Sequence, residues 1–167
     1  MEDKVIVIKE ISKDNIDEYW TLHWEYLNRD IFPYETLVAE SDSEDREYFR
    51  SEQYRGTMEK YMDREPDKAH FIYFYQDDMR MGGAQYVTYK SEDGKCFLMD
   101  FWVFPEYRGN GTGHRCYSSL RDYVKKDGAV YIEINVSNER NHRFWSSIGF
   151  IDDGFDEWGA PLMRLNI

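Results

Sequence analysis

Residues 103–114 read Val103-Phe104-Pro105-Glu106-Tyr107-Arg108-Gly109-Asn110-Gly111-Thr112-Gly113-His114. Three of these glycines stand at every second position, which lets the backbone pass close to a ligand and points successive N–H groups at one place. A mostly apolar run of strand length, residues 96–104, leads into the stretch, and Tyr117, Leu120 and Val124 follow it at helical spacing. The pattern predicts a strand, a glycine loop and a helix whose N-terminus is placed to bind phosphate.

Neither of the commoner nucleotide-binding motifs fits this loop. A dinucleotide fingerprint needs a glycine where His114 stands, and a P-loop needs glycine and lysine followed by serine or threonine. Taken alone, the glycine loop therefore leaves two interpretations open, a phosphate site and an ordinary turn.

Outward from the loop, the sequence predicts a mixed α/β order with an antiparallel hairpin section. The expected strands cover residues 5–9, 71–75, 82–89, 96–104, 130–136, 150–155 and 162–167. The expected helices are a segment capped by Asp14, residues 44–63 with a capped entry at 41–45, a segment ending near Gly128, and residues 141–147. Phe32-Pro33-Tyr34 is expected to form a loop, and the pair Gly82-Gly83 suggests a bulge.

Length and charge narrow the class of protein. A chain of 167 residues with 41% hydrophobic and 32% charged residues is typical of one globular domain. The formal net charge of -12 disfavours nucleic acid as a partner. Residues 103–150 nevertheless carry 7 Lys and Arg against 5 Asp and Glu, whereas residues 1–95 carry 13 against 23. This locally basic stretch suits a small polyanionic ligand.

The expected location is cytoplasmic, with no membrane partner. No run of about 18 apolar residues is present, and the apolar run at 5–8 is too short for a signal-peptide core. Cys96 and Cys116 are expected to be free thiols because two cysteines without Cys-x-x-Cys spacing do not make a disulfide framework. His23, His70, His114 and His142 lack a second ligand at metal spacing, so no metal site is expected.

Two motifs together resemble the GNAT superfamily of acetyl-CoA-dependent N-acetyltransferases. The first is the Arg/Gln-x-x-Gly-x-Gly/Ala loop, matched by Arg108, Gly111 and Gly113 and preceded by Val-x-Pro-Glu-Tyr. The second is Asn-x-x-Ala-x-x-Phe-Tyr-x-x-x-Gly-Phe, which residues 138–150 resemble at the expected distance. The region that carries the resemblance runs from about Phe97 to Phe150.

The resemblance implies one domain over residues 1–167, with a helical acceptor-side region at 14–67 and an acetyl-CoA-binding core at 96–150. It implies a mixed, mostly antiparallel, splayed sheet of six to seven strands with about four helices. In similar enzymes the loop cradles the CoA pyrophosphate, and the strand backbone and the asparagine of the second motif contact the pantetheine arm. The cofactor-binding residues implied in this way are Val103, Arg108, Gly109, Asn110, Gly111, Thr112, Gly113, His114 and Asn138. The N–H of Val103 would also stabilise the developing oxyanion.

The sequence departs from the family at two positions. Trp145 stands where similar enzymes have a tyrosine that protonates the departing thiolate, and Asn141 replaces a small alanine. An indole N–H is a donor but not a usable acid. Either a water or a nearby tyrosine takes that role, or the thiolate leaves unaided, which a thiol pKa of about 8.5 allows. A third alternative is a non-catalytic acyl-CoA-binding sensor.

Asp100 is the candidate catalytic base. An alkyl ammonium with a pKa of about 10.4 must lose a proton at pH 7 before it can attack, which costs roughly 4.6 kcal/mol. Asp100 is a lone carboxylate in an apolar run, and residues 99–103 resemble the Glu-Asp-Phe-Phe-Val stretch of polyamine acetyltransferases, where the acidic residue lines the amine site. The alternative is a structural carboxylate bonded to backbone groups.

The acceptor is expected to be a primary amine of a cationic small molecule, polyamine-like or aminoglycoside-like. Aromatic and acidic side chains of the amino-terminal region could face such a cation: His23, Trp24, Tyr26, Phe32, Tyr34 and the acids between Glu35 and Glu47. The same residues also fit a core face beside a solvated face, and a peptide or protein amine remains an alternative acceptor. A homodimer formed through an edge at residues 162–167 is a further possibility.

Overall fold

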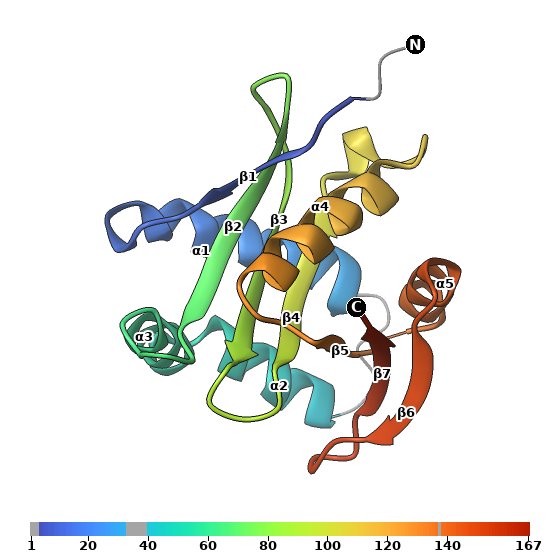
Figure 1. The fold of residues 1–167 in the computed structure, drawn as a ribbon. Helices are drawn as coiled ribbons and strands as arrows, with labels where there is room; N and C mark the ends of the chain where they lie inside the picture. The colour runs from blue at the N-terminus through green and yellow to red at the C-terminus, as the bar shows by residue number, and fades with distance from the viewer. Residues whose placement is uncertain (1–3, 33–39, 137) are drawn as a thin grey trace.

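The computed structural model describes residues 4–32, 40–136 and 138–167. Seven strands form one mixed sheet in the order β1-β2-β3-β4-β5-β7-β6 (Figure 1). Only β4 and β5 pair in parallel among the described strands, and every other pair is antiparallel. The strands are β1 (Val7–Glu10), β2 (Ala69–Gln76), β3 (Met79–Tyr89), β4 (Lys95–Val103), β5 (Tyr131–Asn135), β6 (Ile151–Phe155) and β7 (Pro161–Asn166).

The sheet is splayed at its centre. The parallel pairing of β4 with β5 begins at Lys95 opposite Tyr131 and ends at Leu98 opposite Ile134. β4 then continues to Val103 paired with β3 alone. A bulge marks the same place, because Leu98 pairs with Tyr86 and Asp100 with Gln85, leaving Met99 as the extra residue. The predicted mixed, splayed sheet is therefore confirmed.

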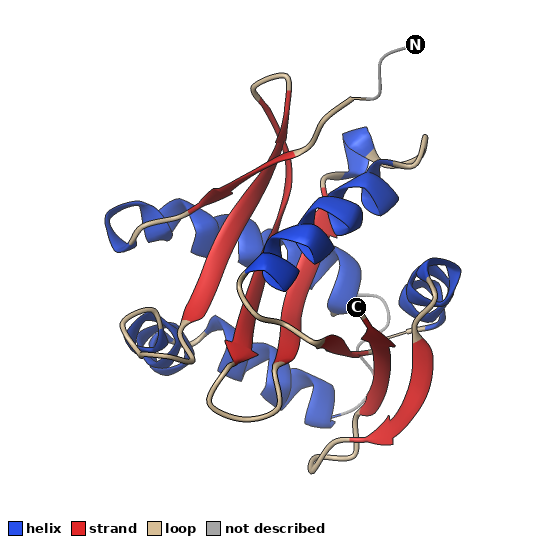
Figure 2. Cartoon of the chain, in the orientation of Figure 1, coloured by secondary structure: helices blue, strands red, loops and turns tan. Residues whose placement is uncertain are grey.

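Helices cover both faces of the sheet (Figure 2). They are α1 (Ile16–Tyr26), α2 (Glu40–Arg50), α3 (Glu52–Tyr61), α4 (Thr112–Lys126) and α5 (Glu139–Ile148). A π-helical turn, η2 (Leu27–Ile31), extends α1. Short 3₁₀ turns, η1 (Lys13–Asn15) and η4 (Pro105–Tyr107), precede α1 and follow β4.

Strand alternation divides the core into two layers. On β2, Ile72 and Phe74 pack with Leu120 of α4, whereas Phe71 and Tyr73 pack with the aromatic side of α1 and with α3. These four β2 side chains are almost fully buried. Each face of the sheet thus has its own hydrophobic core, and the chain between β1 and β2 supplies one of them.

Two expectations about the amino-terminal helices were wrong. The single helix expected over residues 44–63 is two helices, because Ser51 between them has extended backbone (φ -70°, ψ 152°) and its Oγ accepts a hydrogen bond from Tyr54 N at 3.2 Å. Asp14 does not cap α1, since it lies in η1 and Asn15 is the residue before the helix. The described chain therefore has five α-helices, one more than the sequence suggested.

The remaining expectations concern residues 41–45, the loop at Pro33-Tyr34 and the two cysteines. The expected entry at residues 41–45 lies inside α2, which begins at Glu40. The expected loop at Pro33-Tyr34 lies outside the described residues. Cys96 and Cys116 are buried free thiols, as predicted.

The glycine pair in β3 has a packing reason as well as the predicted bulge. Phe74 pairs with Gly82 and Tyr75 with Arg80, so Met81 is an extra residue beside the pair. A Cβ at Gly82 would lie 2.0 Å from the carbonyl oxygen of Trp102, and a Cβ at Gly83 would lie 2.7 Å from the Trp102 ring. The two glycines let β4 and its tryptophan approach β3 closely.

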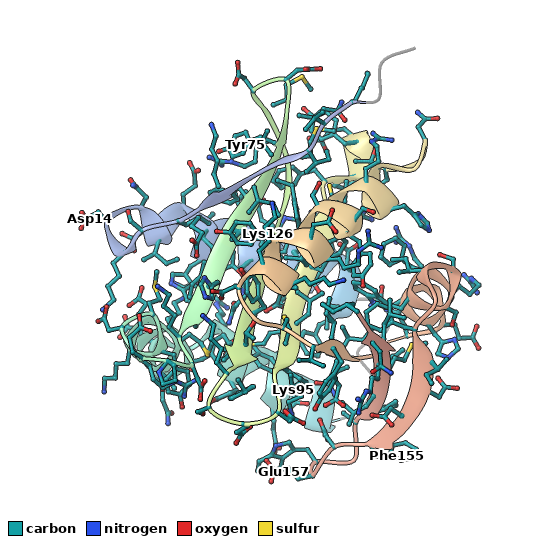
Figure 3. The ribbon with its side chains drawn as sticks, viewed as in Figure 1. Asp14, Tyr75, Lys95, Lys126, Phe155 and Glu157 are labelled. Carbon is teal, nitrogen blue, oxygen red and sulfur yellow. The ribbon has the colours of Figure 1, made fainter. Side chains whose placement is uncertain are left out.

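The carboxyl-terminal edge differs from expectation. β7 is an inner strand between β5 and β6, so the segment expected to form an edge at residues 162–167 pairs on both sides and cannot receive a second copy. The free edge is β6, all of whose residues are exposed. Figure 3 shows Phe155 and Glu157 in the hairpin that ends this edge.

Two glycine-to-alanine substitutions should have opposite effects on stability. Gly56 lies inside α3 with open space around its Cβ position, so Gly56→Ala should raise the free energy of unfolding by about 0.5–1 kcal/mol through helix propensity. Gly82→Ala should lower it by about 3 kcal/mol because a backbone atom blocks the methyl group. Urea denaturation of both variants tests this, and equal effects would contradict the structure.

Candidate active site

A cleft of about 380 Å³ opens where β4 and β5 separate. It is lined by Tyr26, Asp30, Phe101, Trp102, Val103, Arg108, Gly109, Gly111, Thr112, Gly113, His114, Arg140, Asn141 and Phe144. Its walls therefore come from the end of β4, the glycine loop with the start of α4, the first turns of α5, and the end of α1 with η2.

The end of β4 presents backbone groups to this cleft. Phe104 N–H donates to the carbonyl of Met81 in β3 at 2.9 Å. Because the backbone groups of successive strand residues point to opposite edges, the N–H and C=O of Val103 point away from β3, toward the splay. The carbonyl oxygen of Val103 is already occupied, since it accepts a hydrogen bond from Arg108 Nε at 2.8 Å. The Val103 N–H points to the same side, toward the cleft that Val103 lines.

The glycine loop is held in a left-handed backbone conformation at three consecutive residues. The φ angles are 85° at Gly109, 52° at Asn110 and 77° at Gly111, and Gly111 is the N-cap residue of α4. The first N–H groups of a helix have no partner within the helix, so those of Gly113 and His114 remain for a ligand. Arg115 Nη1 braces the loop by donating to the Asn110 carbonyl at 2.7 Å. The result is a ready anion site.

The predicted cofactor residues do not all share one role in the structure. Seven of them line the cleft: Val103, Arg108, Gly109, Gly111, Thr112, Gly113 and His114. Asn110 and Asn138 are not among the lining residues. Asn138 is the N-cap of α5, where its Oδ1 accepts from Asn141 N at 2.9 Å, and its Nδ2 donates to the Asp30 carbonyl at 3.2 Å.

Asp100 lies behind the cleft wall, paired with His23. His23 Nε2 and Asp100 Oδ2 are 3.1 Å apart, and their side chains are 2% and 10% exposed. Aromatic rings enclose the pair, and two of them, Tyr26 and Trp102, stack with centroids 5.0 Å apart and also line the cleft. One aromatic layer therefore separates the carboxylate from the open cleft.

Tyrosines beside this pair keep their protons. Burial, and after it the charge of Asp100, raises the pKa values of Tyr19, Tyr26 and Tyr54 above the ordinary value near 10. Two of these hydroxyls bond to Gln85, which accepts from Tyr19 at 3.1 Å and donates to Tyr54 at 3.2 Å. These phenols act as hydrogen-bond donors or acceptors and not as anions.

Trp145 is a core residue. Its side chain is buried and packs edge-on against Phe101, Tyr117 and Phe150. The neighbouring Phe144 lines the cleft instead, stacking on Phe101 with centroids 5.9 Å apart. The indole therefore fills space where the related enzymes are expected to carry an acid.

The aromatic side chains of the acceptor-side region lie in different surroundings. Tyr26 lines the cleft, whereas Trp24 packs beneath the guanidinium groups of Arg46 and Arg50. Phe32 stacks on Phe49 of α2. Tyr34 and Glu35 lie outside the described residues, so the expectations for them have no structural counterpart.

Several cleft residues are absent from the sequence-based prediction. Phe101, Trp102, Asn141 and Phe144 lie inside the two quoted motifs or next to them, so proximity to the motifs was an available signal. Asp30 carries no such signal because it belongs to a helix end that reaches the cleft only through the fold.

Comparison with known proteins agrees with this geometry. A sequence profile of the acetyltransferase (GNAT) family matches residues 15–150. The PaiA N-acetyltransferase of Thermoplasma acidophilum, solved in complex with coenzyme A, superposes with a TM-score of 0.71 at 16% identity, over 97% of this chain and 99% of that one. An acetyltransferase of Thermus thermophilus superposes with a TM-score of 0.67 at 11% identity over both full lengths.

One relative is similar to this chain over a short segment only. The uncharacterized protein ML0378 of Mycobacterium leprae is 40% identical over 48 residues, which is 29% of this chain and 13% of that protein. The mixed splayed sheet of this chain is the fold of these solved acetyltransferases. The chain belongs to the acetyltransferase (GNAT) family.

Within the described residues, every helix is too short or too polar to cross a membrane.

Substitutions at Gly111 should report on the left-handed loop. Asparagine tolerates positive φ, whereas a β-branched residue does not, so Gly111→Asn should cost less than about 1 kcal/mol of stability and Gly111→Val at least about 2 kcal/mol. Thermal unfolding of the two variants beside the wild type measures the difference. Equal losses would mean that the loop adopts another conformation in solution.

Proposed function

We propose that this protein transfers the acetyl group of acetyl-CoA to a primary amine by direct attack. The observation that carries the proposal is the juxtaposition, in one cleft, of the glycine loop with a Val103 N–H that points away from β3. In this proposal residues 96–150 are the acetyl-CoA-binding core and residues 14–67 form the acceptor side of a single domain.

The cleft suits acetyl-CoA chemically. The N–H groups at the start of α4 suit the pyrophosphate, and the loop residues Arg108 to His114 surround that point. The apolar side chains of Phe101 and Phe144 suit the uncharged arm. When bound, acetyl-CoA supplies an activated acyl group. The Val103 N–H is placed to donate a hydrogen bond to the carbonyl oxygen as negative charge develops there.

Asp100 is proposed as the catalytic base, and its pairing adds His23 to that role. The ammonium group must lose a proton before its nitrogen can attack. A histidine that is hydrogen-bonded to a buried carboxylate can accept a proton, because the carboxylate stabilises the imidazolium that forms. The Tyr26–Trp102 wall would have to admit the amine or a water for that transfer.

Neither Trp145 nor Tyr26 is a suitable acid for the leaving thiolate. Trp145 is buried away from the cleft, and Tyr26, raised in pKa by burial and by Asp100, is a weaker acid than the thiol. We propose that the thiolate leaves without a proton from the protein, since a thiol pKa of about 8.5 makes it a tolerable anion.

The proposed acceptor is a cationic small molecule, polyamine-like or aminoglycoside-like, and the proposed location is cytoplasmic. Support for the acceptor comes from exposed acids on the acceptor side, Glu44, Asp45 and Glu47 on α2. These carboxylates would raise the local concentration of a polycation.

The test is release of the CoA thiol from acetyl-CoA across polyamines, aminoglycosides, amino acids and short basic peptides. Asp100→Asn should lower kcat/KM for the best amine at pH 7 by about 100-fold, within the range typical of general-base loss. Asp122→Asn, which removes an exposed carboxylate from α4, is the matched control and should change nothing. If the acceptor is polycationic, its KM should rise with ionic strength.

Each result has a distinct meaning. Turnover with peptides alone would replace the small-molecule acceptor by a peptide or protein amine. Binding of CoA without turnover of any amine would favour the sensor alternative, with buried Trp145 as its structural basis. An Asp100→Asn enzyme as active as the wild type would remove Asp100 from the mechanism.

A further inference from the structure

Asp30 joins the two motif side chains that the family resemblance assigns to the cofactor. Its Oδ2 accepts a hydrogen bond from Arg108 Nη2 at 2.6 Å, and its backbone carbonyl accepts one from Asn138 Nδ2 at 3.2 Å. These contacts span 78 and 108 residues of sequence. Asp30 itself belongs to η2 at the end of α1, in neither motif.

The Asp30 carboxylate is enclosed by positive charge. Besides Arg108, its Oδ2 lies 3.3 Å from Arg29 Nε, and its Oδ1 lies 3.9 Å from Arg140 Nη1. The side chain is 10% exposed and lines the cleft. Arg108 and Arg29 make charge-assisted hydrogen bonds to this carboxylate, which are stronger than the ion pair of an exposed side chain such as Arg140.

Both motif side chains make hydrogen bonds within the protein. Arg108 donates from Nε to the Val103 carbonyl and from Nη2 to Asp30. Asn138 uses its oxygen to cap α5 and its nitrogen to reach Asp30. Both therefore connect parts of the protein across the splay, with η2 between them.

The π-helical turn explains how Asp30 reaches this position. Leu27 to Ile31 continue α1 with a wider turn, which shifts the following side chains relative to a regular α-helix. Leu27 stays buried in the aromatic core while Asp30 lines the cleft. Such π-turns are frequent at functional sites.

We infer that Asp30 is a positioning residue for acetyl-CoA binding. It acts through Arg108, which holds the Val103 carbonyl and thereby sets the end of β4 against the glycine loop. It also fixes Asn138 and so the start of α5 on the opposite wall. This inference rests on the proposed function, because it concerns the same cleft.

The test uses two ligands measured by isothermal titration calorimetry, CoA and adenosine 3′,5′-bisphosphate, which carries phosphates but lacks the pantetheine arm. Asp30→Asn should raise the Kd of both ligands by about tenfold, as expected for loss of one charge-assisted hydrogen bond. Arg108→Gln should do the same. Because both residues act through the same hydrogen bond, their effects should not add. The Kd of the double variant should exceed that of the weaker-binding single variant by less than about threefold.

Asp122→Asn, which removes an exposed carboxylate from α4, is the control for net charge and should shift either Kd less than twofold. Circular dichroism melts of each variant report folding. If Asp30→Asn does not fold, Asp30→Ser replaces it, both as a single variant and together with Arg108→Gln.

Additive losses in the double variant would overturn the inference, since Asp30 would then act independently of Arg108. A loss confined to CoA would overturn it in favour of direct contact between Asp30 and the pantetheine arm. Unchanged Kd values with a raised KM for the amine would overturn it in favour of an acceptor role. Wild-type protein that binds neither ligand would instead refute the proposed function and the inference together.

Discussion

The separation of β4 from β5 after Leu98 is the constraint on which the site depends. Backbone groups in a sheet interior normally pair, and unpaired ones are costly when buried. Here the strand beyond Met99 keeps β3 on one side and turns its other edge to a cleft. Arg108 satisfies the Val103 carbonyl from within the chain, and the N–H of Val103 points to the same side as a donor. The same separation that exposes polar backbone thus creates the proposed oxyanion position.

Packing on the other face supports this arrangement. The glycine pair in β3 lets Trp102 sit close to the sheet, and Trp102 with Tyr26 forms the wall between the cleft and the His23–Asp100 pair. Removing one partner of such a buried pair leaves an uncompensated polar or charged group, which makes the pair costly to change singly. Stability and the proposed proton transfer therefore depend on the same few residues of α1 and β4.

The local sequence pattern predicted helices and strands correctly where a single pattern of apolar residues covered the whole element. The strand, glycine loop and helix around residues 96–128 follow from an apolar run of strand length, closely spaced glycines and apolar residues at helical spacing, and the structure has all three. The expectation of one helix over residues 44–63 was wrong because the backbone at Ser51 is extended and its Oγ caps a new helix. The edge expected at residues 162–167 was wrong because strand order is not a property of one segment.

By itself, the sequence determined the family, the glycine loop and the position of the lone carboxylate in the apolar stretch that forms β4. Each of these features is recognised from a short, contiguous stretch of residues. Only the tertiary structure decided which side chains surround that carboxylate and how the motif residues are used. His23 meets Asp100 across 77 positions, and Asp30 meets Arg108 across 78. Such pairs depend on how α1 and η2 lie across the splayed sheet, and that placement follows from burial of two cores at once, which no local pattern contains.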